Sequence, residues 1–281
     1  MNYDGELRTL QLRLLDVLTE IDRVCREQDL TYYLLAGTML GAIRHHGFIP
    51  WDDDIDIGMP RGDYDRFFEI AHQCLPNYLE LKNYTSHPDY IWWFMKVEDK
   101  RTTLIEKKWL KYKGGIYIDI FPLDGEPENQ LKRKLHFGMI EYRMKIRYFM
   151  YRDPFKHGKG IGAWFVRFLQ SVYTRERAQR RLEEQLKKYK YDLAGLVCDH
   201  DGGDLSLMPK SYVGSPVPVT FEGRQFMGVE NPDAYLKSMY GDYMQLPPEG
   251  KRIQHGFYYF DLNIPYQDNP IDKEIWPNKF I

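Results

Sequence analysis

Residues 54–57 read Asp-Ile-Asp-Ile, and this alternation constrains the fold more than any other stretch of the chain. Side chains of a β-strand point to opposite faces in turn, so the isoleucines would face a core while Asp54 and Asp56 share the other face. Asp52 and Asp53 precede them and add like charge. A divalent cation between the carboxylates would relieve the repulsion, and without it one carboxyl should stay protonated. The pattern therefore predicts a strand with a hard-oxygen cation site.

The segments around this strand predict a mixed α/β unit. Apolar residues at three- and four-residue steps predict an amphipathic helix of about five turns between Leu7 and Cys25. The apolar stretch 31–37 predicts a buried strand that ends at Gly37, with a short helix after it. A longer helix is expected after Pro60, because proline favours the first turn of a helix. Three more strands are expected, at 77–85, 90–99 and 114–125.

The second half of the chain has a different pattern. From Pro127 to about Lys190 it is helical. Beyond this segment, glycine and proline are frequent and predict turns and loops, with one more helix. We therefore predict two parts, a mixed α/β core over 1–125 and, over 126–281, a helical segment and a C-terminal region that pack on this core.

Charge is spread unevenly along the chain. The net charge is −2, but residues 131–190 hold 17 lysines and arginines against 5 acidic residues. A basic segment beside an acidic body suggests an anionic partner, such as a membrane surface, nucleic acid or a phosphorylated glycan. Val166, Phe168 and Leu169 beside Arg167 would give apolar anchors for such a surface. The alternative is a solvated helical face.

The cysteines and the N-terminal residues bear on the compartment. Cys25, Cys74 and Cys198 contain no CxxC pair, which argues against a disulfide framework and for a reducing compartment. Neither a signal peptide after Met1 nor an apolar run long enough to span a bilayer is visible. We therefore expect a soluble cytoplasmic protein, with the basic segment as a candidate for peripheral contact with the inner membrane face.

Two further features favour a cation site over a plain acidic turn. Gly37 and Thr38 stand between an apolar strand and a helix, and the free N–H groups at a helix N-terminus form a ready anion site. Asp119 lies inside an apolar strand, where a charge needs a partner. A third carboxylate on a neighbouring strand would complete a site for Mg²⁺ or Mn²⁺, which bind oxygen ligands and substrate phosphates. Asp124 is less persuasive, because Leu-Asp-Gly predicts a turn.

Other acidic positions rank lower. Asp52 would precede the strand, and Asp53 would point to its other face. His200 could join its neighbours in CDHDGGD as a metal cluster, but the spacing fits no zinc pattern and a turn is favoured.

The order of these features resembles the nucleotidyltransferase fold: an apolar strand, Gly-Ser/Thr, a short helix, two acids one residue apart, and a third acid on a later strand. The stretch AGTMLGAIRHHGFIPWDDDIDIGMPRGDYDRF is similar to the LicD/fukutin-related branch, as are KVEDKRTT, IYIDIFPLDG and YGDYMQLPPEGKRIQH. The resemblance covers residues 30–125 strongly and 215–256 more weakly. It implies an α/β (α+β) fold with a mixed sheet flanked by helices, a helical basic insertion and a loop-rich C-terminal region.

The resemblance implies a phosphotransferase. Members resemble enzymes that take phosphocholine or a polyol phosphate from a CDP-activated donor, place it on a hydroxyl of a cell-surface glycan or its lipid-linked precursor, and release CMP. It implies a CDP-linked donor, a glycan acceptor, Mg²⁺ or Mn²⁺ as cofactor, and no nucleic acid partner. Asp54, Asp56 and Asp119 would be the catalytic and metal-binding residues, with Asp119 as acceptor of the proton.

The resemblance also implies a set of substrate-binding residues. Gly37 and Thr38 would hold donor phosphates through backbone and hydroxyl groups, and Thr38 keeps the hydroxyl of the serine that the wider fold often has. Lys96 is a candidate phosphate contact, with a solvated strand lysine as the alternative. Arg252 and His255 would bind a phosphate or the nucleotide, or serve as structural hydrogen-bond donors.

Choline would need an aromatic cage, because a quaternary ammonium makes no hydrogen bonds and is held by ring faces. Tyr90, Trp92 and Trp93 are candidates for such a cage. Trp92 and Trp93 would face opposite sides of a strand, so at most one of them could share the site. Packing in the core or at the surface is the alternative for all three.

Two other functions compete with phosphotransfer. A sugar-nucleotide glycosyltransferase also uses an Asp-x-Asp metal site, but it usually lacks the Gly-Ser/Thr turn and the later strand acid. A catalytically silent scaffold could bind membrane or nucleic acid through residues 131–190. Against the scaffold, a silent site has no reason to keep buried charge at Asp54, Asp56 and Asp119.

Overall fold

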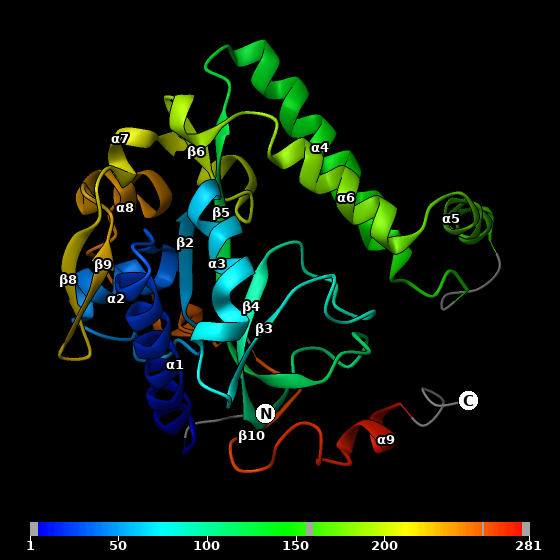
Figure 1. The fold of residues 1–281 in the computed structure, drawn as a ribbon, viewed down its shortest axis with the longest axis horizontal. Coiled ribbons are helices and arrows are strands. Elements are labelled where there is room, and N and C mark those ends of the chain that lie inside the picture. The colour runs from blue at the N-terminus through cyan, green and yellow to red at the C-terminus, as the bar shows by residue number, and fades with distance from the viewer. Residues whose placement is uncertain (1–4, 156–159, 255, 277–281) are drawn as a thin grey trace.

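The computed structural model describes residues 5–155, 160–254 and 256–276. These residues fold around a central mixed sheet (Figure 1). In the described residues the strands of this sheet are β1 (Tyr33–Leu34), β2 (Asp56–Pro60), β3 (Leu79–Lys82), β4 (Met95–Ile105), β5 (Gly114–Glu126), β6 (Leu196–Cys198), β7 (Met208–Pro209) and β10 (Tyr259–Asp261). Their main order is β1-β2-β5-β4-β10; β3 pairs with β4, and β6 joins β5 to β7. β2 and β5 run parallel, and the other pairs are antiparallel. The predicted mixed sheet is confirmed.

Helices surround the sheet. They are α1 (Leu7–Glu27), α2 (Ala36–His45), α3 (Arg61–Cys74), α4 (Gln130–Met150), α5 (Ile161–Val172), α6 (Arg175–Leu186), α7 (Lys210–Val213), α8 (Pro232–Tyr240) and α9 (Ile271–Ile275). α1 and α3 pack against the sheet, while α4 and α6 form a helical hairpin that leads away from it, with α5 at its far end (Figure 1). None of the helices within the described ranges combines the length and the apolarity that crossing a bilayer requires.

The apolar stripe predicted for the first helix is the face that α1 buries. Leu14, Leu18 and Ile21 are fully buried in the main core, because apolar residues at this spacing share one face of a helix. The polar face carries ion pairs along the helix, such as that of Arg23 with Glu27. α1 thereby fixes the core side of the sheet and leaves its strand ends for the site.

The predicted elements of the first part are confirmed, with shifted bounds. β2 begins at Asp56, so Asp54 lies in the loop just before the strand. α2 begins at Ala36, which puts Gly37 and Thr38 inside its first turn. Residues 90–94 precede β4 and are not part of it.

The turn predicted at Asp124 is wrong. Asp124 lies inside β5, is fully buried, and pairs with Arg61 at the start of α3. The Arg61 Nε donates to Oδ1 of Asp124 at 2.7 Å. β5 continues through Leu-Asp-Gly because β6 pairs with it there, with Asp124 opposite Cys198. That long-range pairing overrides the local turn signal.

The C-terminal region holds more regular structure than predicted. β6, β7 and a separate hairpin of β8 (Val217–Phe221) and β9 (Arg224–Gly228) form where turns were expected. Phe221, Phe226 and Tyr235 belong to the same hydrophobic core as α1 and β2. The α4–α6 hairpin has two small clusters of its own. The division at residue 125 stays a prediction, and the region after the hairpin packs on the first part.

Candidate active site

Asp56 and Asp119 lie beside each other on neighbouring strands. The parallel register of β2 and β5 pairs Asp56 with Asp119 and Ile57 with Ile120. The N–H of Asp119 also donates to the carbonyl oxygen of Ile55 at 3.2 Å. Because residues paired across a sheet project from the same face, both carboxyls stand on the polar face. Ile55 and Ile57 are fully buried on the other side, which confirms the predicted alternation.

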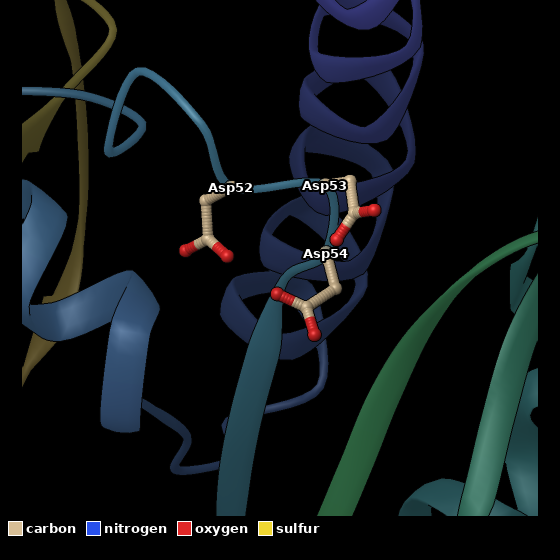
Figure 2. A group of neighbouring side chains, drawn as sticks. All are labelled: Asp52, Asp53 and Asp54. Atoms are coloured by element: carbon tan, nitrogen blue, oxygen red, sulfur yellow. The ribbon is translucent and has the colours of Figure 1, made fainter. Parts of the chain in front are cut away.

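Three aspartates gather in the loop that leads into β2 (Figure 2). Asp54 stands where the chain enters the strand, and Asp52 and Asp53 precede it. Each offers a carboxylate oxygen, and these oxygens all lie within 4.8 Å of one another. In the described part of the chain, no other trio of His, Cys, Asp or Glu comes this close. The loop thus draws Asp52 and Asp53 nearer to Asp54 than strand alternation predicts, although Asp53 is buried and the other two are half-buried.

Negative charge accumulates where this loop meets the strands. Burial and then the charges of Asp54 and Asp119 raise the pKa of Asp56 well above its usual range, with further contributions from Asp201 and Asp52. Each of these four carboxylates disfavours ionisation of Asp56. The predicted repulsion among the aspartates is therefore present.

Lys96 is an ion-pair partner of Asp119 and not a solvated strand lysine. It lies opposite Asp119 in the β4–β5 register and is 1% exposed. Its Nζ lies 3.0 Å from Oδ1 of Asp119 and 2.7 Å from Oε1 of Glu106. The same atom lies 3.2 Å from the ring centre of Tyr117 and 4.2 Å from that of Trp92. Two carboxylates and two ring faces therefore enclose the ammonium, and its predicted contact with a phosphate stays a prediction.

The pKa of Asp119 reflects opposed effects. Burial raises it, the ammonium of Lys96 lowers it, and the charges of Glu106 and Asp54 raise it again. The balance is a pKa of about 7. Burial lowers the pKa of Lys96, but Asp119 and Glu106 outweigh that effect, so the lysine stays charged. Asp119 can therefore gain or lose a proton near neutral pH while its neighbour remains a cation.

The N-terminal turn of α2 reaches the same place. Oγ1 of Thr38 accepts a hydrogen bond from the backbone N–H of Asp56 at 2.9 Å. The N–H of Leu35 donates to the carbonyl oxygen of Asp56 at 3.0 Å. A Cβ on Gly37 would lie 3.0 Å from Oδ2 of Asp52, so glycine permits this close approach. The first N–H groups of a helix lack acceptors within it, which gives this end of α2 the character of an anion site.

The late motif reaches the loop of aspartates through Arg252. Its Nε donates to the carbonyl oxygen of Pro247 at 2.9 Å. Its guanidinium lies 5.3 Å from the ring centre of Trp51, which precedes Asp52 in the chain. These contacts support the structural-donor alternative, and a phosphate contact stays a prediction. His255 lies outside the described residues.

The loop after β6 contributes an acid that the sequence reasoning placed in a turn. Asp201 lies in a bend, as predicted, and is exposed. Its charge nevertheless acts on Asp56. Partial burial and the charge of Asp199 raise the pKa of Asp201 to about 6, and Asp54 contributes. The acidic residues of CDHDGGD are the signal that the sequence offers for this contribution. Their approach to the other carboxylates, however, depends on the pairing of β5 with β6.

The aromatic residues proposed as a choline cage pack against neighbouring rings, and Trp92 and Trp93 are half-buried. Tyr90 is fully buried. Tyr90, Trp92 and Tyr112 meet edge to face, with ring centres 5.0 to 5.6 Å apart. Trp93 packs separately, 5.4 Å from Phe94. The structure thus shows packing, the alternative given for these three residues. Trp92 also contacts the ammonium of Lys96.

A cavity of about 730 Å³ lies between α4 and the loop after β6. Arg133, Lys134 and Phe137 line it from the helix, and His200 and Asp201 line it from the loop. Because the charge of Asp201 also acts on the site carboxylates, the cavity neighbours the strand ends that carry them. It is a candidate place for a substrate.

Comparisons with known proteins match this chain to a family of nucleotidyltransferase domains. Residues 29–156 match the family described as LicD/FKTN/FKRP, nucleotidyltransferase domain. The chain is 34% identical over 257 residues to the lipopolysaccharide cholinephosphotransferase LicD of Haemophilus influenzae. The matched region covers 89% of this chain and 95% of that protein. It is 31% and 30% identical to uncharacterised proteins of Rickettsia typhi and Rickettsia prowazekii, over 46% of this chain and 41% and 48% of theirs. The family match contains the site from Gly37 to Asp119.

Proposed function

Because the chain belongs to the LicD/FKTN/FKRP nucleotidyltransferase family, we propose that it transfers phosphocholine, or a related phospho-alcohol, from a CDP-linked donor to a hydroxyl of a glycan and releases CMP. Its relative in Haemophilus influenzae is a cholinephosphotransferase, and the chain is accordingly a transferase. The observation that carries the proposal is the parallel register that sets Asp56 beside Asp119, two residues after Asp54.

Asp54, Asp56 and Asp119 do not form so close a trio in the described chain as Asp52, Asp53 and Asp54 do, but their carboxylate oxygens are the kind of ligand that a divalent cation prefers. Burial and then the neighbouring carboxylates raise the pKa of Asp56, so a positive charge beside it would favour its ionised form. Lys96 does not supply one, because it is shared between Asp119 and Glu106. We propose that Asp54, Asp56 and Asp119 hold Mg²⁺ or Mn²⁺, whose hard-oxygen preference these ligands match. When bound, the cation would stabilise charge on the attacking and leaving oxygens of the phosphate.

The first turn of α2 supports binding of the donor's diphosphate. The hydroxyl oxygen of Thr38 accepts the N–H of Asp56, and its hydrogen stays available to a phosphate oxygen. The N–H of Ala36 donates to the hydroxyl of Tyr235 at 2.9 Å, so the N–H groups of Gly37 and Thr38 would contact the phosphate, and the partial positive charge of a helix N-terminus favours an anion. Gly37 keeps the turn close to the loop that carries Asp52. The donor phosphates would thus lie between α2 and the carboxylates.

The transfer requires a proton to leave the acceptor. The acceptor oxygen forms a bond to the phosphorus that carries choline, and the bond from that phosphorus to the CMP oxygen breaks. Asp119, with a pKa of about 7, can take the hydroxyl proton near neutral pH. The adjacent Lys96 favours the ionised form that this role needs.

The test is release of CMP from CDP-choline by the purified chain, with Mg²⁺ or with EDTA, and with or without a crude lipopolysaccharide acceptor. We expect release that requires Mg²⁺, rises with acceptor and is lost in Asp56→Asn. Asp16→Asn, on the exposed face of α1, is the matched control and should behave as the unmodified chain. Turnover of a UDP-sugar without CMP release would favour a glycosyltransferase, and no turnover of any nucleotide would favour a silent scaffold.

A further inference from the structure

α5 presents an apolar face to solvent. None of the residues of this helix is buried. Five large apolar side chains are 49 to 92% exposed, and they are Ile161, Trp164, Phe165, Phe168 and Val172. Their three- and four-residue spacing places them on one face. Exposed apolar residues are ordinary when scattered, but a contiguous face of them marks an interaction site.

The opposite side of α5 holds the helix on the molecule. Leu169 packs against the cluster that contains Ile146 and Met150. The side-chain amide of Gln170 donates to two backbone carbonyls at the end of α4, each at 2.8 Å. Leu169 and the half-buried Val166 therefore face the protein, and of the predicted apolar anchors only Phe168 faces solvent. The exposed face is left over once these contacts are made.

α4 carries a second exposed apolar stripe. Its members are 41 to 69% exposed, and they are Leu131, Leu135, Met139 and Tyr142. Continued along the helix at the same spacing, the stripe reaches Ile146 and Met150, which are buried in the cluster shared with α5 and α6. The same helical face is thus covered in its second half and bare in its first half.

Basic side chains are exposed on the same helices as these apolar surfaces and on α6. Exposed on α4, α5 and α6 are Lys132, Lys134, Lys145, Arg167, Arg177, Arg180 and Arg181. A groove of about 200 Å³ between α4 and α6 combines the two chemistries, with Met139 and Tyr142 beside Arg143, Arg177 and Arg181. An apolar face bordered by lysine and arginine is the pattern of a helix that lies in the interface of an anionic bilayer.

We propose that α5 and the bare half of α4 dock the helical hairpin onto an anionic lipid bilayer. The rings of Trp164, Phe165 and Phe168 would enter the headgroup region, and the basic residues would pair with lipid phosphates. The charge of the segment, 17 basic against 5 acidic residues over 131–190, selects an anionic lipid surface. The apolar face alone would not favour anionic lipids, and the charge alone would not favour a bilayer over another anion.

This docking deepens the proposed function, and its link to the acceptor rests on that function. The cavity beside the carboxylates is lined by Gln130, Arg133 and Lys134 of α4, the helix whose Leu131 and Leu135 are exposed. A glycan carried on a membrane lipid would therefore reach the carboxylates along the helix that touches the bilayer. Binding to the bilayer itself does not depend on the reaction.

The test is co-sedimentation of the full chain with vesicles of phosphatidylcholine alone or mixed with phosphatidylglycerol. We expect binding to the mixed vesicles that weakens between low and physiological salt, because exposed charges are screened within about 8–10 Å. Phe165→Ser combined with Phe168→Ser should lower the vesicle-bound fraction at least about tenfold, since each ring loses apolar area on leaving the interface. If the ring of Trp164 enters the bilayer, brominated lipid should quench the tryptophan fluorescence of the unmodified chain, and this quenching should disappear in Trp164→Tyr.

The control pair is Leu193→Ser with Leu12→Ser, which removes side chains that are 84% and 46% exposed elsewhere on the molecule. This pair should bind vesicles as the unmodified chain does, and both pairs should keep CMP release in solution. Absence of vesicle binding at any salt would overturn the docking. So would a dimer in sedimentation equilibrium that the phenylalanine pair abolishes, since a second copy would then cover the face. CMP release without vesicle binding rejects the docking alone, and vesicle binding without CMP release rejects the proposed reaction alone.

Discussion

Two acids of the strand β5, Asp124 and Asp119, have surroundings that differ in charge. Asp124 of β5 is fully buried and meets Arg61, one carboxylate to one guanidinium. Earlier on the same strand, Asp119 shares Lys96 with a second carboxylate and stands beside Asp56. Both acids stand on β5, so the comparison is between the charges that each of them meets.

The two sites differ in what their charges do to pKa. Burial alone would lower the pKa of Arg61, but Asp124 outweighs it and holds that guanidinium ionised. At the other site burial raises the pKa of Asp56, and the neighbouring carboxylates raise it further. A fold gains nothing from repelling carboxylates that are half-buried. The comparison therefore separates an acid that one guanidinium balances, Asp124, from acids whose charges repel one another.

Replacement of a site acid should give the largest effect. Asp54→Asn or Asp56→Asn should abolish measurable CMP release, because the proposed cation that stabilises charge on the phosphate loses a ligand. The EDTA-treated variants should melt at the same temperature as the unmodified chain or higher, because a repelling charge is gone. Rate assays beside thermal melts check this. Near-normal turnover in both variants would remove these residues from the site.

Breaking the balanced pair should instead affect the fold. Asp124→Asn leaves the guanidinium of Arg61 buried without its carboxylate, and such a loss costs about 3–5 kcal/mol. Asp65, 3.8 Å from Arg61 and with a side chain that is 43% exposed, is a poor substitute. Urea denaturation measures the loss, and the rate per folded molecule should stay within a few fold. A double variant with Arg61→Met should lose less than the sum of the single changes. A selective loss of turnover at full stability would place Asp124 in the site.

The pH dependence of stability sharpens the comparison at Asp119. Its folded pKa of about 7 lies above its ordinary value of 3.8. A carboxyl with a raised folded pKa contributes stability that is complete below about pH 4 and is lost as pH rises through about 7. Without Mg²⁺, the melting temperature of the unmodified chain should therefore fall relative to Asp119→Asn between about pH 5 and pH 8. A difference of a few degrees is expected, since about 1 kcal/mol moves such a midpoint by roughly 2–4 °C.

The outcome separates the two roles of this residue. If Asp119→Asn melts earlier at every pH and keeps its rate per folded molecule, then Asp119 serves the fold by pairing with Lys96. If the variant gains relative stability as pH rises and loses turnover, the charge of Asp119 serves the site. Added Mg²⁺ should remove the pH effect in the unmodified chain, because a bound cation favours the ionised carboxyl.

Local patterns predicted the strand that carries Asp56 and the later strand that carries Asp119, because alternation needs no long-range information. They could not predict the partners. The contact of Lys96 with Asp119 follows from the β4–β5 register, and the burial of Asp124 follows from the pairing with β6. Asp201 approaches the site for the same reason. Likewise, the sequence indicates apolar anchors at Val166, Phe168 and Leu169, but which side chains of α5 stay exposed depends on how it packs on α4.

The smallest effect is expected at Thr38, and it tests whether the balance of charge alone defines the site. Thr38→Val keeps the shape of this buried side chain but removes the acceptor for the N–H of Asp56, and an unsatisfied buried donor costs about 1–3 kcal/mol. Turnover should fall by about tenfold, while Thr38→Ser, which keeps the hydroxyl, should stay within a few fold. Kinetics over a range of Mg²⁺ and CDP-choline concentrations then distinguish two roles. If Thr38 only positions Asp56, the Mg²⁺ requirement of the valine variant rises and excess Mg²⁺ restores much of the rate. If the hydroxyl binds a donor phosphate, KM for CDP-choline rises and Mg²⁺ restores nothing. Full activity in Thr38→Val would show that the carboxylates work without support from α2.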